Sequence, residues 1–281
     1  MVSRSGGEEF AFWPFQGEQL YTALHPARGE RRAMVVICGP FGAERERAYL
    51  ESVHWGRRLA ARGVDVLRFD YRGMGESTGA FEGRTLSDWQ ADVEHMLEKM
   101  RQRDRDVPLV LQGLRMGGLL ALEPFARGLA DGLLLWSAPP SGTDMLRDIL
   151  RRQLTADLAR KGPRKKSDEY IKEIEEGALV NVDGYFWSKA LWNDARTFTL
   201  KLPRAEAGGR PWLALDIDLT PLPEGAVPKA PPVGPETHKL AVPSARFWDH
   251  SQRMVPACGP LEDASEAWLD LFVPTSASGA A

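Results

Sequence analysis

The segment from Leu109 to Leu120 carries the residues whose spacing points most directly to chemistry. An apolar run ends at Gly113, a second glycine stands at position 117, and a helix-forming run follows. This pattern predicts a strand that turns sharply into a helix, with glycines where neighbouring atoms leave no room for a Cβ. Arg115 occupies the apex of the predicted turn. The chemistry of this turn is therefore the chemistry of a guanidinium group.

A guanidinium group excludes some reactions and favours particular ligands. Its pKa lies above ~12, so it stays protonated and has no lone pair for nucleophilic attack. It offers five N–H donors, and together with the backbone amides of Phe41 and Met116 it would bind a carboxylate, phosphate or sulfate. Three roles remain open for Arg115: an internal ion pair with Glu44, contact with an anionic ligand, and electrostatic support of a reaction.

Several other residues are weak candidates for catalytic groups away from this turn. Cys38 and Ser137 each end a predicted buried strand and would be displaced nucleophiles. Asp216 or Asp218 would supply an acid after a later strand, and His250 follows the last strand, where a base is needed. A buried cysteine is usually a small apolar residue, however, and His250 also fits a surface loop. We expect no metal site, because no His, Cys, Asp or Glu spacing indicates one.

The elements that must position these residues alternate along the chain. Continuous apolar runs, typical of strands buried on both faces, are separated by segments with helical periodicity. The predicted strands are a hairpin within 10–24, then 33–38, 64–70, 109–113, 132–137 and 210–217, and a last strand near 239–247. The predicted helices are 49–62, 86–100, 116–127 and 261–272. This order predicts an α/β fold with a mostly parallel central sheet and helices on both faces.

Residues 141–200 break this alternation. The segment is predicted to be helical over Thr143–Lys161, Ser167–Glu176 and Asp183–Arg196, and it contains no run long enough to join the sheet. Insertions at the carboxyl ends of strands cover the ligand crevice in open α/β sheets, so we expect a helical cap. The expected domains are a core of residues 1–140 and 201–273, a cap insertion of residues 141–200, and a disordered tail of residues 274–281.

Three motifs in this order resemble those of the α/β-hydrolase fold. The run Gly-Pro-Phe-Gly at 39–42 stands where such proteins carry the oxyanion-hole loop. Residues 70–77 resemble their D-x-R-G-x-G-x-S turn, and residues 113–117 occupy the nucleophile elbow, where those hydrolases have a serine. The resemblance implies an α/β-hydrolase fold that lacks the serine nucleophile.

A closer resemblance covers almost the whole chain and is to the second type of hydrolase associated with exosortase A systems. It rests on Pro40-Phe41 followed by Glu44, on the elbow Gly-Leu-Arg-Met-Gly, and on Leu146–Leu158, Val182–Tyr185 and Ala245–Trp248. In that bacterial family, encoded near exopolysaccharide and protein-sorting machinery, an arginine commonly occupies the elbow apex. The resemblance implies a bacterial role linked to exopolysaccharide or the envelope, although its name rests on fold analogy, which does not establish chemistry.

Composition limits the partners that we expect. The 281 residues carry a formal net charge of −3 at pH 7, which gives no reason to expect nucleic acid or an anionic membrane surface. No stretch approaches the ~20 apolar residues of a membrane span, and the N-terminus lacks the apolar region of a signal peptide. Cys38 and Cys258 are too few for a disulfide framework. We therefore expect a cytoplasmic protein.

The leading functional hypothesis is a non-classical or pseudo-hydrolase. It would bind a small anionic or acyl-type ligand, or a protein partner, in the crevice below the cap, and we expect no cofactor. The alternative is an active ester or acyl hydrolase, or an acyltransferase, whose relocated nucleophile is Cys38 or Ser137, assisted by His250. A third hypothesis is structural: Arg115 is paired internally and side chains fill the crevice.

Overall fold

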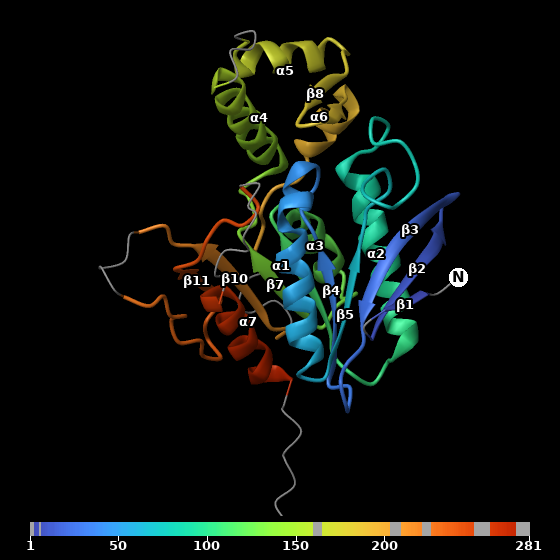
Figure 1. The fold of residues 1–281 in the computed structure, drawn as a ribbon, viewed down its shortest axis with the longest axis vertical. Coiled ribbons are helices and arrows are strands. Elements are labelled where there is room, and N and C mark those ends of the chain that lie inside the picture. Colours follow the sequence, from blue (N-terminus) through green and yellow to red (C-terminus); the bar gives the residue numbers. More distant parts are fainter. Residues whose placement is uncertain are drawn as a thin grey trace, which may run out of the picture.

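The computed structural model describes residues 3–5, 7–159, 165–202, 209–220, 226–249 and 259–273. The strands of its main sheet are β1 (Ser3–Ser5), β2 (Glu8–Phe15), β3 (Glu18–His25), β4 (Ala33–Cys38), β5 (Val64–Phe69), β6 (Leu109–Leu114), β7 (Gly132–Trp136), β10 (Trp212–Ile217) and β11 (Lys239–Val242). Within the described residues they form one nine-stranded sheet in the order β1-β2-β3-β5-β4-β6-β7-β10-β11 (Figure 1). From β5 to β11 in this order, each strand pairs in parallel with the next. The pairs β1–β2, β2–β3 and β3–β5 are antiparallel. The predicted mostly parallel sheet is therefore confirmed.

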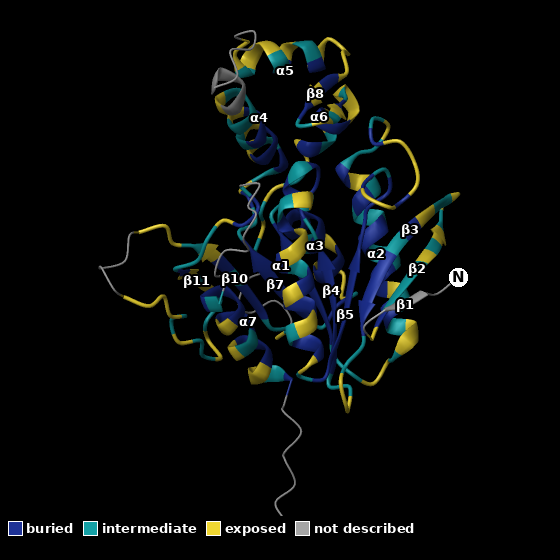
Figure 2. Cartoon of the chain, in the orientation of Figure 1, coloured by how far each residue is buried: buried dark blue, intermediate teal, exposed yellow. Residues whose placement is uncertain are grey.

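Helices cover both faces of this sheet. They are α1 (Ala43–Ala60), α2 (Leu86–Arg103), α3 (Met116–Ala126) and α7 (Gly259–Phe272). Successive side chains of a strand point to opposite faces, so Met34 and Val36 enter one buried cluster and Val35 and Ile37 enter another. The first cluster includes residues of α2 and α3, and the second includes residues of α1 and α7. The sheet is buried between them, and exposed residues lie on the outer helix surfaces (Figure 2).

The remaining elements lie between β7 and β10 in the chain. They are α4 (Gly142–Ala159), α5 (Ser167–Glu175), β8 (Val180–Val182), β9 (Tyr185–Trp187) and α6 (Lys189–Ala195). They stand together beyond one end of the main sheet, above the start of α1 (Figure 1). The segment leaves and returns at one place, because Ser141 and Thr199 form an antiparallel bridge. On α1, Glu46 accepts a hydrogen bond from the Tyr185 hydroxyl, 3.1 Å away.

Two hairpins show how turn residues determine local structure. The predicted N-terminal hairpin is confirmed: Gln16 and Gly17, both with positive φ, connect paired residues Phe15 and Glu18. The second hairpin corrects the prediction of a helix over Asp183–Arg196. Asp183 (φ 50°) and Gly184 (φ 90°) form the two-residue loop between β8 and β9. Such a loop favours Asp-Gly because both positions need positive φ. The predicted helix is therefore reduced to its second half, α6.

Most of the remaining boundaries agree closely with the sequence, with three differences. The helix predicted over 49–62 begins earlier, at Ala43, so that Glu44 lies in its first turn. The last strand, predicted near 239–247, ends at Val242, since Pro243 cannot donate to the ladder. Strand β1, at the sheet edge, was not predicted. The predicted tail, residues 274–281, lies outside the described residues.

Candidate functional site

The turn between β6 and α3 has the strained geometry that the sequence predicts. β6 ends at Leu114, α3 begins at Met116, and Arg115 between them has φ 53° and ψ −119°. A residue with a side chain held in such a conformation stores about 1–3 kcal/mol, which the surrounding structure must offset. Part of that support is the amide of Arg115, which donates to the carbonyl of Trp136 on β7 at 3.0 Å.

Both glycines of the turn are required by close approach of backbone atoms. A Cβ on Gly113 would lie 2.4 Å from the Cα of Gly118, and a Cβ on Gly117 would lie 1.9 Å from the carbonyl oxygen of Cys38. Cβ atoms essentially never come within 3.0 Å of a heavy atom outside their own residue and its chain neighbours. The start of α3 therefore packs directly on the end of β4, as the glycine spacing predicts.

The Arg115 guanidinium contacts two carboxylates. Its Nη2 lies 3.2 Å from Oε1 of Glu44 and 3.0 Å from Oδ2 of Asp148. Glu44 stands in the first turn of α1 with a side chain that is 1% exposed, whereas Asp148 on α4 is 42% exposed. The expected contact between Arg115 and Glu44 is present. Asp148 adds a second, more accessible partner.

A second arginine joins the same two carboxylates. Arg152 lies one helical turn after Asp148 on α4, and its Nη2 contacts Glu44 Oε1 and lies 3.5 Å from Asp148 Oδ2. Its Nη1 bonds the carboxylate of Asp249. Buried charges are stable only when they are paired, and Glu44 here has two cationic partners. We call Arg115 and Arg152 the arginine pair. The two converge on one buried and one accessible carboxylate oxygen.

The loop after β11 covers this pair. The guanidinium carbon of Arg115 lies 5.6 Å from the ring centroid of Trp248, close enough for a cation–π contact. Asp249, next in sequence, is bonded to Arg152. His250, the candidate base on this loop, lies outside the described residues.

Side chains largely fill the crevice beside Glu44. A cavity of about 10 Å³ remains there, lined by Phe41, Glu44, Ile149, Tyr185, Trp187 and five neighbours, and it has room for about one water molecule. Within the described part of the chain, Oε2 of Glu44 and Nε of Arg152 are buried without a hydrogen-bond partner. One acceptor and one donor of the site thus remain unused.

Aromatic side chains form the apolar wall of this cavity. The ring of Phe41 lies 6.0 Å from that of Trp187 and 6.2 Å from that of Phe81, and Phe81 lies 4.9 Å from Tyr185. Phe41 and Met116, whose amides are expected at an anion site, are both buried. An apolar group would therefore meet aromatic surface next to the charged cluster.

The two candidate nucleophiles have different surroundings. Cys38 is fully buried, and burial raises the pKa of its thiol far above the usual range, so the reactive thiolate does not form at neutral pH. Ser137 is half-buried at the end of β7, where its φ of 46° is unusual for a residue other than glycine. Its amide donates to the carbonyl of Leu215 on β10 at 2.8 Å. Ser137 is the more accessible of the two.

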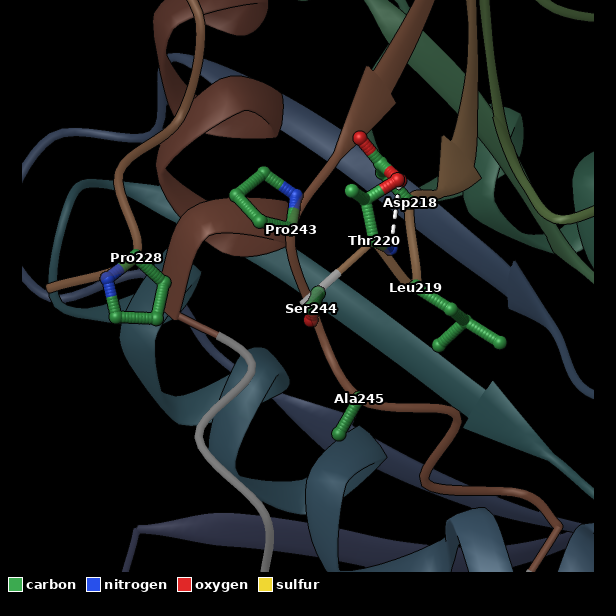
Figure 3. A pocket seen from close by; sticks show the side chains of 7 residues that line it. All are labelled: Asp218, Leu219, Thr220, Pro228, Pro243, Ser244 and Ala245. Carbon is green, nitrogen blue, oxygen red and sulfur yellow. Dashed lines mark hydrogen bonds between the residues drawn. The ribbon is translucent and has the colours of Figure 1, made fainter. Parts of the chain in front are cut away.

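The candidate acid, Asp218, stabilises its own loop. It follows β10, and its Oδ1 accepts the amide hydrogen of Thr220 at 2.9 Å. The Thr220 hydroxyl and amide lower the pKa of this carboxyl. Asp218 also lines a separate cavity of about 370 Å³ (Figure 3).

Among the described residues, no three His, Cys, Asp or Glu side chains gather as metal ligands. None of the helices that the structure describes is long and apolar enough to cross a membrane.

Sequence reasoning missed Asp148, Arg152 and Asp249. The spacing of Asp148 and Arg152, four residues apart on a predicted helix, is a signal for an ion pair along the helix. It does not show that both would face Arg115, because that depends on how α4 docks.

Residues 29–165 match a family model described as serine aminopeptidase, S33. Two curated relatives, the mitochondrial palmitoyl-protein thioesterases ABHD10 of Homo sapiens and Pongo abelii, are 31% and 32% identical over 133 residues. That region covers 42% of this chain and 42% of each thioesterase, so the chain spans less than half of their length.

Two solved structures share the fold over nearly their whole length. Est1E from Butyrivibrio proteoclasticus, solved with ferulic acid, has a TM-score of 0.60 and 20% identity, with 94% of this chain and 98% of that chain covered. XC6422 from Xanthomonas campestris, an α/β serine hydrolase without a lid, has a TM-score of 0.55 and 14% identity, with 96% and 97% covered.

Proposed function

We propose that this chain, which has the α/β-hydrolase fold, binds an anionic ligand at Arg115 and forms no acyl-enzyme there. The observation that carries the proposal is the convergence of Arg115 and Arg152 on Asp148 Oδ2, at 3.0 and 3.5 Å. A protonated guanidinium cannot attack an acyl carbon, whereas two of them around one oxygen suit the binding of a carboxylate. Asp148 then occupies the position of the ligand's carboxylate.

Exchange of Asp148 for a ligand requires little rearrangement of charge. Its side chain is 42% exposed and can return to water, and an exposed ion pair of this kind contributes at most about 1 kcal/mol. Glu44 stays in place beneath the arginine pair and keeps the buried charge balanced. The unused Nε of Arg152 supplies one more donor for the incoming anion.

An apolar, acyl-type tail on the ligand is supported by the aromatic wall beside Glu44. Phe41, Tyr185 and Trp187 line the small cavity there. The names of similar proteins agree with an acyl ligand, since they include palmitoyl-protein thioesterases and Est1E, which was solved with ferulic acid. These are properties of those proteins, and for this chain they support a proposal only.

Access for such a tail requires residues 141–200 to act as a cap. The cavity holds about one water molecule at present, so Tyr185 and α4 must shift before a tail can enter. The joined ends of this segment, at the bridge between Ser141 and Thr199, support its movement as one unit. We propose the domain division at 141–200 on this basis.

The biological setting is proposed from the resemblance to exosortase A-associated hydrolases. The elbow Gly-Leu-Arg-Met-Gly and the segment Ala245–Trp248 support a bacterial, cytoplasmic protein linked to an exopolysaccharide or exosortase pathway. Trp248 contacts Arg115, so this part of the resemblance falls at the site itself. A protein partner that presents a carboxylate would use the same contacts.

Calorimetric titration with sodium octanoate tests the proposal, with acetate and 1-octanol as probes that lack the tail or the charge. We expect octanoate to bind more tightly than either, and Arg115→Met to weaken it by about tenfold or more, since charge-assisted hydrogen bonds are lost. Arg151→Met is the matched control, because this α4 arginine is 68% exposed and its nearest approach to Asp148 is 3.9 Å. Equal loss in both variants, or equal binding of 1-octanol, would overturn the anion site.

An active hydrolase or acyltransferase remains the second candidate, and the strained backbone of Ser137 is the observation that favours it. Strain at a strand end is often associated with functional sites. A fluorophosphonate probe distinguishes the two functions. Labelling that disappears in Ser137→Ala would establish a relocated serine nucleophile, and an unlabelled protein supports the binding function.

A further inference from the structure

The small cavity beside Glu44 has an accessible side between α1 and the β8–β9 hairpin. Most of its lining residues are buried. The half-buried ones are Ala43 and Arg47 in the first two turns of α1, and Asp183 and Tyr185 around the turn of the hairpin. We call residues 183–185 the hairpin tip. The entrance to the cavity therefore lies between the start of α1 and this tip.

Tyr185 closes the entrance with its ring. A Cβ built on Gly42 would lie 3.5 Å from Cδ2 of Tyr185, so the ring lies against the backbone that precedes α1. Its centroid is 4.9 Å from that of Phe81, and its hydroxyl donates to Oε1 of Glu46 at 3.1 Å. Burial and the charge of Glu46 raise the pKa of Tyr185 to about 12, so the hydroxyl remains a donor at neutral pH.

An ion pair is the second polar contact between the hairpin tip and α1. Oδ2 of Asp183 lies 3.3 Å from Nη2 of Arg47, and the two side chains are 26% and 24% exposed. Within residues 141–200, the amide of Asp183 donates to Oε1 of Gln153 on α4 at 3.0 Å. A partly exposed ion pair changes an equilibrium by up to about fivefold. The tip is therefore held weakly enough to open and close.

Other parts of the segment 141–200 are attached to the core more firmly. On α6, the carboxylate of Asp194 accepts hydrogen bonds from the amide and the hydroxyl of Ser87 at the start of α2, at 2.7 and 2.8 Å. On α4, Arg152 bonds the buried carboxylate of Glu44, and breaking that pair would leave a buried charge underpaired. The hairpin tip is thus the part that separates from the core most readily.

We propose that the hairpin tip is a gate for the apolar tail of the ligand, closed by Tyr185 and held by the pair of Arg47 and Asp183. The proposal takes its ligand from the function proposed for Arg115, whereas the gate itself is defined by contacts within the protein. When the tip moves away from α1, a tail can reach the aromatic wall of the cavity. An anion without a tail needs only to displace the exposed Asp148, so the gate acts on tailed anions alone.

Calorimetric titrations of Asp183→Asn with sodium octanoate and sodium acetate test the gate. Asparagine tolerates the positive φ of this turn position and removes the charge that pairs with Arg47. The ratio of octanoate affinity to acetate affinity should rise by about two- to fivefold, because the tip opens more readily. Asp168→Asn is the matched control, since it removes the same charge from an exposed position on α5. An unchanged ratio in Asp183→Asn, or an equal rise in the control, would overturn the gate.

A second measurement needs no ligand. The chain has five tyrosines, so fluorine NMR of protein labelled with 3-fluorotyrosine gives few signals, and Tyr185→Phe identifies that of Tyr185. We expect this signal to shift toward that of free fluorotyrosine in Asp183→Asn and to stay in place in Asp168→Asn. A signal that stays in place in both variants would refute the gate even if octanoate binds. If the signal moves but octanoate does not bind the native protein, the tip opens as proposed and the ligand proposed for Arg115 is wrong.

Discussion

Arg115 and Glu44 form an ion pair, with Nη2 of the arginine 3.2 Å from Oε1 of a carboxylate whose side chain is 1% exposed. The arginine stands at the apex of the turn, and the glutamate lies in the first turn of the helix that follows β4. A hydrolase of this fold has its nucleophile at that apex. In this chain the apex carries a positive charge with a buried counter-charge.

Loss of the arginine should destabilise the protein through Glu44. In Arg115→Met the carboxylate keeps only Arg152, so we expect the free energy of unfolding to fall by about 1–3 kcal/mol. Urea denaturation measures this change. In the double variant Arg115→Met with Glu44→Gln the two effects should not add, because the second substitution removes the charge that the first leaves underpaired. Strict additivity would show that the pair contributes nothing to stability.

The close contact between α3 and β4 predicts that position 117 accepts only glycine. Its Cβ in Gly117→Ala would meet the carbonyl of Cys38 at 1.9 Å, which backbone atoms can relieve only by moving apart. We expect a loss of about 3 kcal/mol or more, or no folded protein. Gly83→Ala is the control, because a Cβ there has no atom within 4 Å and should change stability little. Thermal unfolding of the two variants decides the point.

His25 should make stability depend on pH in the acid range. Burial, together with the charge of Arg68, lowers its pKa from 6.5 to about 4, and the Nε–H of Arg68 donates to its Nε2 at 2.8 Å. The folded state therefore binds fewer protons than the unfolded state between pH 4 and 6.5. The lowered pKa of His25 therefore adds to the free energy of unfolding. This addition is complete above pH 6.5 and is lost as the pH falls toward 4, by at most about 1.4 kcal/mol per pH unit.

Comparison with His25→Gln isolates this contribution from those of the carboxyl groups. The difference in unfolding free energy between the native protein and the variant should shrink on acidification from pH 6.5 to 4. A difference that is constant over this range would contradict a neutral, buried His25.

Cys38 should be unreactive in the folded protein. It is fully buried and its thiol pKa is raised, so a thiol reagent at neutral pH should modify it only after unfolding. Cys258→Ser, which leaves Cys38 as the sole cysteine, makes the assay specific. Rapid modification of the folded variant would instead revive Cys38 as a displaced nucleophile.

The core of the fold was predictable because its signals are local. Buried strands such as 33–38 are continuous apolar runs, and the glycines around Arg115 mark a turn that tolerates no Cβ. The pairing of Arg115 with Glu44 followed from the rule that buried charges need partners. These features depend on neighbours in sequence or on a general energetic cost.

The parts that were missed depend on tertiary docking or on weak signals. Asp148 and Arg152 reach Arg115 only because α4 packs across the elbow, and no local pattern gives that orientation. The Asp183-Gly184 hairpin had a turn signal, but its strands are only three residues long, and the helical neighbourhood outweighed it. The cavity at Asp218 combines two loops that are distant in sequence.

If Asp148 occupies an anion site formed by the arginine pair, its replacement in Asp148→Asn should raise the affinity of the protein for octanoate. Removing the internal carboxylate removes a competitor, while Arg115, Arg152 and Glu44 remain. Calorimetry should show octanoate binding up to about fivefold more tightly than in the native protein, the scale of one partly exposed ion pair. Unchanged or weaker binding would show that Asp148 does not occupy an anion site.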